Sequence, residues 1–192
     1  MSMKKLYVIA GCNGAGKTTA SYTILPEVLE CDEFINANEI ARGLSPFKPE
    51  RAGIQAGRLM LQRIKALIHS EQDFAFETTL STKSYKNLIV EAQKNGFTVT
   101  LLFFWLSSQN LAVKRVETRV KEGGHHIPEH IIRRRYENGL KNFFSIFKKV
   151  VDDWMFIDNS GKPYQIVAEG TKGNEEIGNV KIWNTLINKY NG

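Results

Sequence analysis

Two absences limit what this protein can be. The sequence has only two cysteines, Cys12 and Cys31, among its 192 residues, which excludes a disulfide-rich secreted scaffold and suits a reducing compartment. Their spacing does not match a metal site. No apolar run approaches the ~20 residues of a membrane-spanning helix, and the apolar stretch near the amino terminus is too short for a secretory signal. We expect a cytoplasmic protein with no membrane contact.

The composition is that of a globular protein. Hydrophobic residues make up 42% and charged residues 24% of the chain, so it is neither disordered nor fibrous. The length allows one sizeable core and is short for two ordinary domains. Without internal repeats, linkers or low-complexity tracts, residues 1–192 are expected to form a single domain.

Positive charge is concentrated in one segment. The formal net charge is +6, and residues 114–149 hold ten Lys or Arg against four Glu, which leaves the rest of the chain neutral. Three of the four histidines, His125, His126 and His130, lie in the same segment. A solvated helical face is the ordinary explanation of such a run, but its concentration favours a region that handles anions.

Hydrophobic periodicity predicts alternating strands and helices. Strands are expected at residues 6–10, 34–37, 74–77, 98–106, 154–157 and 164–168. Helices are expected at residues 17–29, 51–69, 83–95, 107–121, 128–150 and 177–190. This alternation predicts an α/β fold in three layers with a mostly parallel central sheet.

Residues 11–18 match the phosphate-loop pattern G-x-x-x-x-G-K-[ST] in full, between a predicted strand and a predicted helix. Its glycines let backbone N–H groups approach phosphate oxygens, and the helix that follows directs its positive end at the same anion. Lys17 is expected to contact the β- and γ-phosphates and Thr18 to ligate Mg²⁺. The sequence therefore predicts a P-loop fold that binds ATP or GTP with Mg²⁺ through Gly11, Cys12, Asn13, Gly14, Ala15, Gly16, Lys17, Thr18 and Thr19.

Ligands of a doubly wound sheet sit beyond the carboxyl ends of its strands, and that rule selects among the acidic residues. Glu77 ends a predicted strand, where it can hold a Mg²⁺-bound water or polarise an acceptor hydroxyl. The alternative is a helix-terminal carboxylate paired with Thr78 or Ser81. Asn38 and Glu39 also lie at the correct end of a strand, whereas Asp32 and Glu33 lie at the wrong end and are surface charges. Residues 158–160 follow another strand and form either a turn or a contact to the nucleotide base.

The basic segment offers cations for a transferring phosphate. Arg115 and Arg119 are four residues apart and share one helix face. Arg133, Arg134 and Arg135 are consecutive, so a helix must splay them and they cannot all reach one phosphate. Glycines 123 and 124 form a natural hinge, and residues 123–128 are expected to act as a lid.

Four segments in this order resemble the zeta-toxin family of P-loop kinases, in its compact stand-alone form. They are the phosphate loop, FINANEIARGLSP at residues 34–46, FETTL at 76–80, and GGHHIP at 123–128 leading to RRRY at 133–136. The resemblance covers about residues 5 to 160.

The resemblance implies a cytoplasmic bacterial kinase that uses ATP or GTP and Mg²⁺. The best-known members phosphorylate the 3'-hydroxyl of the sugar of UDP-N-acetylglucosamine and are held inactive by an antitoxin protein. By this resemblance Lys17 and Thr18 serve the nucleotide and metal, Glu77 the metal region, and Arg115 or Arg119 the transferring phosphate. A lid arginine of the typical toxins falls at or near His125.

One residue departs from the family pattern. Members usually carry Asn-Ala-Asp-Glu where this chain has Asn36, Ala37, Asn38 and Glu39. The Asp is the expected base for the acceptor hydroxyl, and Asn38 can orient that hydroxyl but cannot accept its proton. Either Asn38 inactivates the protein, or Glu39 substitutes from a different side of the chain, or the substrate differs.

Three functions follow from these residues. A kinase acting on a small molecule, with a nucleotide sugar as acceptor, is favoured, and its catalytic candidates are Lys17, Asn38, Glu77, Arg115 and Arg119. A non-catalytic nucleotide-binding switch is the second, supported by Asn38. A nucleic-acid end kinase is disfavoured because Phe143, Phe144 and Phe147 fit the apolar face of a helix rather than a base-stacking surface.

Overall fold

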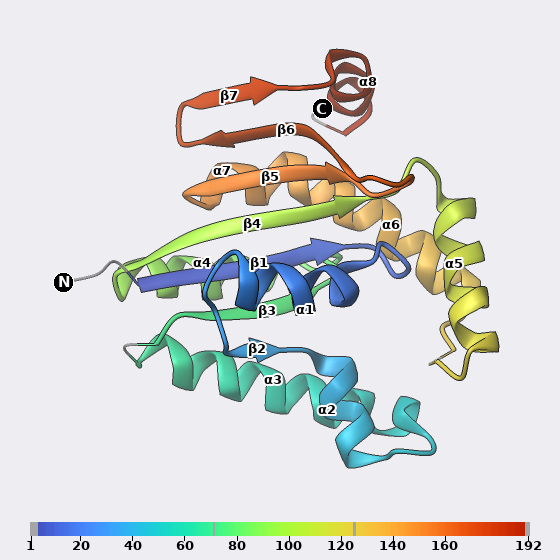
Figure 1. Cartoon of the computed structure of the whole chain (residues 1–192). Coiled ribbons are helices and arrows are strands. Elements are labelled where there is room, and N and C mark those ends of the chain that lie inside the picture. Colours follow the sequence, from blue (N-terminus) through green and yellow to red (C-terminus); the bar gives the residue numbers. More distant parts are fainter. Residues whose placement is uncertain (1–3, 71, 125, 191–192) are drawn as a thin grey trace.

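A seven-stranded sheet forms the centre of the computed structural model, which describes residues 4–70, 72–124 and 126–190. The strands lie in the order β2-β3-β1-β4-β5-β6-β7 (Figure 1). β1 to β5 are parallel, whereas β6 and β7 are antiparallel. The predicted α/β fold with a mostly parallel sheet is confirmed. The strands are β1 (Lys4–Gly11), β2 (Phe34–Ile35), β3 (Phe74–Thr78), β4 (Phe97–Trp105), β5 (Asp153–Asp158), β6 (Gln165–Thr171) and β7 (Asn174–Ile177).

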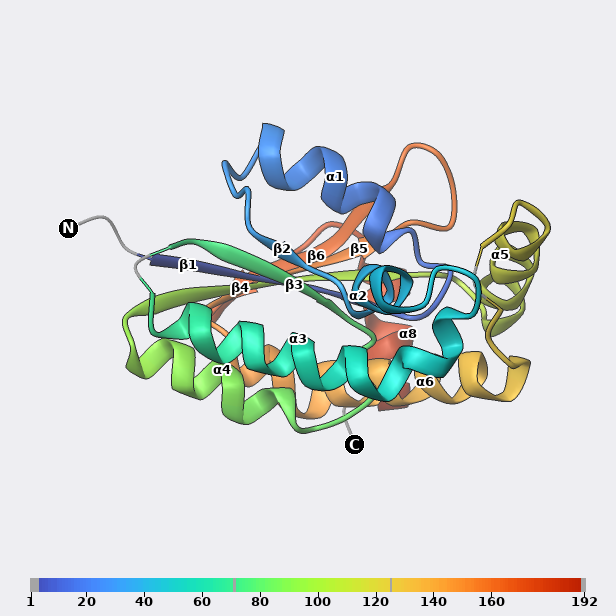
Figure 2. The same cartoon turned by 90° about the horizontal axis from the view of Figure 1, so that it is seen from below.

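β1 and β4 are adjacent strands in the middle of the sheet, and most of their residues are buried. The residues of β1 from Leu6 to Ala10 are at most 5% exposed, because β3 and β4 pair with its two edges and helices cover its faces (Figure 2). A strand covered on both faces can be apolar at every position. This burial explains the continuous apolar runs from which both strands were predicted.

Helices cover the two faces of the sheet unequally. α1 (Lys17–Glu27) lies on one face, and α3 (Gly53–Ile68), α4 (Tyr85–Lys94) and α6 (Glu129–Asn142) lie on the other (Figure 2). α2 (Ala37–Leu44) and α5 (Gln109–Lys121) lie beyond the carboxyl ends of the strands (Figure 1). Within the described parts of the chain, no helix is long and apolar enough to cross a membrane. The remaining helical elements are η1 (Pro49–Ala52), η2 (Phe143–Phe147), α7 (Lys148–Val150) and α8 (Val180–Tyr190).

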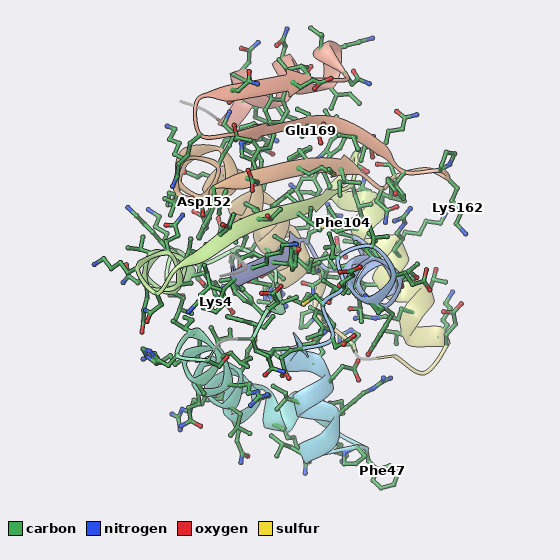
Figure 3. All side chains as sticks on the ribbon, turned by 60° about the vertical axis from the view of Figure 1, so that its left-hand side comes forward. Lys4, Phe47, Phe104, Asp152, Lys162 and Glu169 are labelled. Carbon is green, nitrogen blue, oxygen red and sulfur yellow. The ribbon has the colours of Figure 1, made fainter. Side chains whose placement is uncertain are left out.

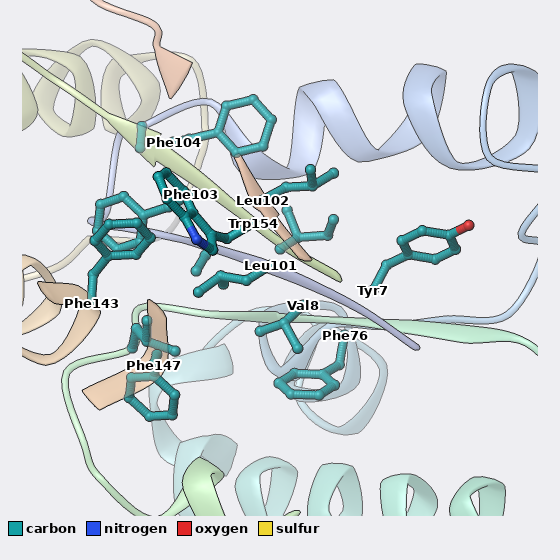
Figure 4. Close-up of a cluster of buried hydrophobic side chains, with 14 of the residues drawn as sticks. Tyr7, Val8, Phe76, Leu101, Leu102, Phe103, Phe104, Phe143, Phe147 and Trp154 are labelled. Carbon is teal, nitrogen blue, oxygen red and sulfur yellow. The ribbon is translucent and has the colours of Figure 1, made fainter. Parts of the chain in front are cut away.

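An aromatic cluster joins β4 and β5 to the helices that follow them. Phe103 of β4 packs on Phe143 of η2 with ring centroids 4.9 Å apart, and Phe143 meets Trp154 of β5 edge-on at 5.7 Å (Figure 4). Trp183 of α8 stacks on Trp154 at 5.3 Å. Stacked and edge-to-face pairs stabilise a core beyond their buried area. The cluster therefore places α8 on the same face of the sheet as α6.

α6 also holds the loop that follows β3. The Asn142 side chain donates a hydrogen bond to the carbonyl oxygen of Leu80, 2.8 Å away. A Cβ at Gly139 would lie 2.8 Å from the carbonyl oxygen of Thr79, so only glycine allows this close approach. α6 therefore packs closely against the backbone of the loop that directly follows β3.

Two sequence-based boundaries are wrong. Residues 34–37 do not form one strand: β2 ends at Ile35, and Ala37 begins α2, a helix that was not predicted. Ile177 does not begin the last helix but ends β7, which was also missed. Every residue of β7 is exposed, so this edge strand lacks the apolar alternation from which strands are recognised.

Asp152 gives the fold a dependence on acidity. Its carboxylate accepts hydrogen bonds from Lys172 Nζ at 2.6 Å, the backbone N–H of Val99 at 2.9 Å and Gln93 Nε2 at 3.0 Å (Asp152 is labelled in Figure 3). Burial alone would raise the pKa of Asp152, but these donors outweigh it and the pKa lies below its usual range.

We expect the stability from Asp152 to be complete above about pH 4, the ordinary aspartate range, and to be lost as pH falls through the lower pKa of the folded protein. The free energy of unfolding, measured in urea from pH 7 to pH 3, should fall less for Asp152→Asn than for wild type. Asp153→Asn is the matched control. If the free energy of unfolding falls equally for wild type and Asp152→Asn over this pH range, the expectation is contradicted.

Candidate active site

A cavity of about 770 Å³ opens at the carboxyl ends of β1 and β3. The phosphate loop, the first turn of α2, the end of β3, and the arginine-bearing faces of α5 and α6 form its walls. The sites predicted from four distant parts of the sequence therefore meet in one place. Its lining includes Asn13, Gly14, Gly16, Lys17, Thr18, Thr19, Asn38, Glu39, Arg42, Glu77, Arg115, Arg119 and Arg135.

The phosphate loop requires glycine at its ends. Gly11 has φ +138°, and a Cβ there would overlap the carbonyl oxygen of Phe104 in β4. Gly16 has φ +84°, and a Cβ there would lie 2.5 Å from Asn159 Nδ2. Gly11 combines a positive φ with a backbone neighbour that excludes a side chain, whereas at Gly16 the positive φ is the main constraint, because Asn159 Nδ2 ends a movable side chain. The loop can thus pass close to β4 and turn directly into α1.

Lys17, Thr18 and Glu77 form a connected polar group at the base of the cavity. Lys17 Nζ donates to the carbonyl oxygen of Cys12 at 2.9 Å and lies 3.5 Å from Glu77 Oε1. Thr18 Oγ1 donates to Glu77 Oε2 at 2.6 Å. The Lys17 and Glu77 side chains are only 5% and 8% exposed. Glu77 therefore pairs with the phosphate loop rather than with Thr78 or Ser81.

Asn36 completes this group. Its side-chain Nδ2 donates to Glu77 Oε2 at 2.9 Å and to Thr18 Oγ1 at 3.4 Å. Its Oδ1 accepts the backbone N–H of Asn38 at 2.8 Å and caps the start of α2. Asn36 is 5% exposed, so these bonds satisfy a buried amide.

The oxygens around Glu77 suit Mg²⁺. Thr18 supplies a hydroxyl and Glu77 a carboxylate, both hard oxygen donors, and Thr18 directly follows the phosphate-loop lysine. Among the residues that the structure describes, no group of three or more His, Cys, Asp or Glu could hold a metal. Proteins bind Mg²⁺ through one or two side chains together with phosphates and waters.

Three arginines reach the cavity from α5 and α6. Arg115 and Arg119 both line it, as their four-residue spacing predicts. Burial lowers the pKa of Arg119, the Glu77 carboxylate opposes that shift, and Arg42 adds to it. Arg135 lies on α6, and its Nη1 donates to Asn13 Oδ1 of the phosphate loop at 3.1 Å.

The rest of the basic segment faces elsewhere. Of its ten Lys and Arg, only Arg115, Arg119 and Arg135 line the cavity. Arg133 pairs with Glu129 at 2.7 Å, and Lys148 pairs with Glu175 at 2.6 Å. The three consecutive arginines are splayed around α6, as predicted. Most of the excess charge is therefore a solvated or ion-paired surface.

The turn after β5 holds the phosphate loop from outside. Asn159 Nδ2 donates to the carbonyl oxygen of Ala15 at 2.8 Å. Ser160 Oγ and its backbone N–H both donate to Asp158 Oδ1, which closes the turn. Arg115 Nη2 donates to the carbonyl oxygen of Ser160 at 3.0 Å. This turn thus joins the phosphate loop to α5.

The first turn of α2 forms the opposite wall. Asn38 and Glu39 are both exposed and both line the cavity. Because α2 begins at Ala37, Asn38 and Glu39 are consecutive residues of one helical turn; their side chains leave the helix about 100° apart, yet both reach the cavity. Arg42 also lines the cavity, and its Nη1 lies 3.8 Å from Glu39 Oε2.

Some predicted residues lie behind the cavity wall. Gly11, Cys12 and Ala15 are at the back of the phosphate loop, where Cys12 and Ala15 are 5% and 0% exposed. Burial raises the pKa of the Cys12 thiol to about 11. Cys12 contributes through its carbonyl oxygen, which accepts the bond from Lys17. His125, at or near which the lid arginine of the typical toxins falls, lies outside the described residues.

Comparisons with known proteins identify the family of this chain. The chain matches the Zeta toxin family model over residues 2–166. An uncharacterized protein of Haemophilus influenzae is 32% identical over 143 residues, which cover 71% of this chain and all of that protein.

Solved structures share the fold at low identity. The AvrRxo1-ORF1:AvrRxo1-ORF2 structure has a TM-score of 0.75 and 15% identity, covering 96% of this chain and 63% of that one. This chain therefore spans less than two thirds of that protein. A structure of the PezAT toxin-antitoxin system of Streptococcus pneumoniae has a TM-score of 0.66 and 14% identity, covering 98% of this chain and 88% of that one. Because the family match extends over most of the sequence and carries the phosphate loop, the protein belongs to the zeta toxin family.

Proposed function

We propose that the protein is a kinase that transfers the γ-phosphoryl group of ATP or GTP to a hydroxyl of a small molecule. Its family and its P-loop fold are those of nucleotide-dependent phosphotransferases. One observation carries the proposal: the bonded group of Lys17, Thr18 and Glu77 opens into the cavity that Arg115 and Arg119 also line.

The donor half of the site is built for a triphosphate. Backbone N–H groups of the phosphate loop and the positive end of α1 bind the phosphate oxygens. Lys17 stabilises charge between the β- and γ-phosphates, and Arg115 and Arg119 stabilise it on the group in transfer. Thr18 and Glu77 would hold Mg²⁺, which supplies further neutralisation of the phosphate oxygens. Burial of Lys17 and Glu77 strengthens these interactions by excluding water.

The acceptor half lies along α2. Asn38 orients the acceptor hydroxyl by hydrogen bonding, and Glu39 is the nearest carboxylate on the same turn that can take its proton. Arg42 offers a cation to an anionic acceptor. A nucleotide sugar of the UDP-N-acetylglucosamine type fits these requirements, because it offers sugar hydroxyls beside a diphosphate.

An antitoxin partner belongs to the same proposal. PezAT is a toxin-antitoxin system, and AvrRxo1-ORF1 was solved together with AvrRxo1-ORF2. Membership of the zeta toxin family supports a comparable protein that binds this chain and blocks its cavity. The single domain at residues 1–192 and its cytoplasmic location remain part of this proposal.

We propose that the segment between α5 and α6 closes over the substrates. Gly124 and Ile127 line the cavity, and Gly123 has φ +85°. Binding of a non-hydrolysable ATP analogue together with the acceptor should slow amide hydrogen exchange at residues 123, 124 and 127 about tenfold or more, because closure protects amides from water. The β6–β7 turn is the internal control. Unchanged exchange in the segment would contradict closure.

A screen of acceptors tests the function directly. Wild-type protein, Mg²⁺ and γ-labelled ATP should be incubated with UDP-N-acetylglucosamine, other nucleotide sugars, nucleosides and RNA 5' ends. Labelling of a sugar hydroxyl supports the proposal. Labelling of RNA ends alone would assign a nucleic-acid kinase. Tight ATP binding without labelling of any acceptor would favour a nucleotide-binding switch.

A further inference from the structure

We propose that Asn36 is a positioning residue that holds Glu77 and Thr18 in register with the helix that carries Asn38. The inference rests on the kinase function proposed above and adds to it the residue that links the donor and acceptor halves. Asn36 does not line the cavity, so it acts through its neighbours rather than on a substrate.

One end of the Asn36 amide fixes α2. Its Oδ1 accepts the backbone N–H of Asn38 at 2.8 Å, and its backbone is extended, with φ −131° and ψ 119°. This is the geometry of a helix N-cap, in which the side chain replaces a missing backbone acceptor. The direction in which Asn38 and Glu39 leave the first turn therefore depends on Asn36.

The other end fixes Glu77. Asn36 Nδ2 lies 2.9 Å from Glu77 Oε2, the oxygen that also accepts the Thr18 hydroxyl at 2.6 Å. The amide orientation follows from its partners: the N–H of Asn38 needs an acceptor, and the carboxylate of Glu77 needs a donor. If the amide were flipped, Nδ2 would face the N–H of Asn38, two donors together, and Oδ1 would face Glu77 Oε2, two acceptors together.

An amide of this length is required for both contacts. An aspartate would keep the cap but place a second carboxylate oxygen 2.9 Å from Glu77 Oε2. A serine would also keep the cap, because serine and asparagine are comparable N-caps, but it has no amide N–H to extend to Glu77. Asn36→Ser therefore separates capping from positioning.

The first arm of the test measures catalysis. For Asn36→Ser we expect kcat to fall at least tenfold, while the dissociation constant of ATP in EDTA changes less than twofold. Asn179→Ser is the matched control, because Asn179 caps α8 through a 3.1 Å bond from the N–H of Ile182, away from the cavity. It should leave kcat unchanged. If Asn36→Ser keeps wild-type kcat, Asn36 is only a cap and the inference is overturned.

The second arm needs neither acceptor nor metal. Urea unfolding in EDTA should be compared for wild type, Asn36→Ser, Glu77→Gln and the double variant. Because the amide donates to a carboxylate, we expect Asn36→Ser to shift the unfolding midpoint at least twice as far in wild type as in Glu77→Gln. Additive shifts would overturn the inference. If no acceptor is phosphorylated by wild type, the kinase proposal fails, and this cycle still decides the role of Asn36.

Discussion

Replacing Lys17 by alanine should lower phosphoryl transfer about a thousandfold, the scale at which a preorganised cation stabilises transition-state charge. The Lys17 side chain is 5% exposed, and its ammonium group is held between the carbonyl oxygen of Cys12 and the carboxylate of Glu77. A buried cation of this kind interacts with phosphate charge more strongly than one in water. Turnover of labelled ATP with the acceptor found in the screen is the measurement.

A loss of turnover in Lys17→Ala has to be distinguished from a loss of folding. Glu77 keeps its bonds from Thr18 and Asn36 when Lys17 is removed, so we expect Lys17→Ala to remain folded. Lys86→Ala, on the exposed face of α4, is the matched control for loss of one positive charge. Wild-type turnover in a folded Lys17→Ala protein would remove Lys17 from the donor site.

Asn38→Asp should raise turnover about tenfold or more, because an aspartate can accept the proton of the acceptor hydroxyl and an asparagine cannot. The gain is smaller than general-base catalysis can provide, since phosphoryl transfer through a loose transition state depends mainly on positioning and charge. Asn38 lies on the first turn of α2 and lines the cavity, so the new carboxylate would face the acceptor. kcat and KM for the acceptor should be measured for both proteins.

The matched control for Asn38→Asp is Asn87→Asp on the exposed face of α4, which makes the same chemical change far from the cavity. Glu39→Gln completes the set. Equal turnover in wild type and Asn38→Asp, with loss of activity in Glu39→Gln, would make Glu39 the base. No effect of either change would show that transfer needs no base from this turn.

Local patterns were sufficient for most of the fold. Spacing over fewer than about ten residues predicts the apolar strands β1 and β4 and the phosphate loop. It also places Arg115 and Arg119 on one helix face. α2 was missed because its start depends on the Asn36 side chain, and an isolated helix this short has little stability of its own. β7 was missed because it is a fully exposed edge strand.

The contacts that complete the candidate site join residues far apart in the chain. Asn36 bonds to Glu77 across 41 positions, Arg135 to Asn13 across 122, and Asn159 to Ala15 across 144. No local spacing encodes such pairs, because they form only after the strands have assembled. In the sequence, Asn36 stands out only as part of the segment at residues 34–46 that carries the family resemblance, and that segment does not indicate its partners.

The phosphate-binding loop after a buried strand, and the place of Glu77 at the same edge of the sheet, follow from the amino-acid sequence, since both depend on local geometry and on the parallel order of strands. Which of the ten cations in the basic segment reach the cavity, and that Asn38 and Glu39 share one helical turn, became visible in the folded protein alone. Helix packing selects one face of α5 and α6, and a side-chain cap sets where α2 begins, and neither depends on local sequence spacing.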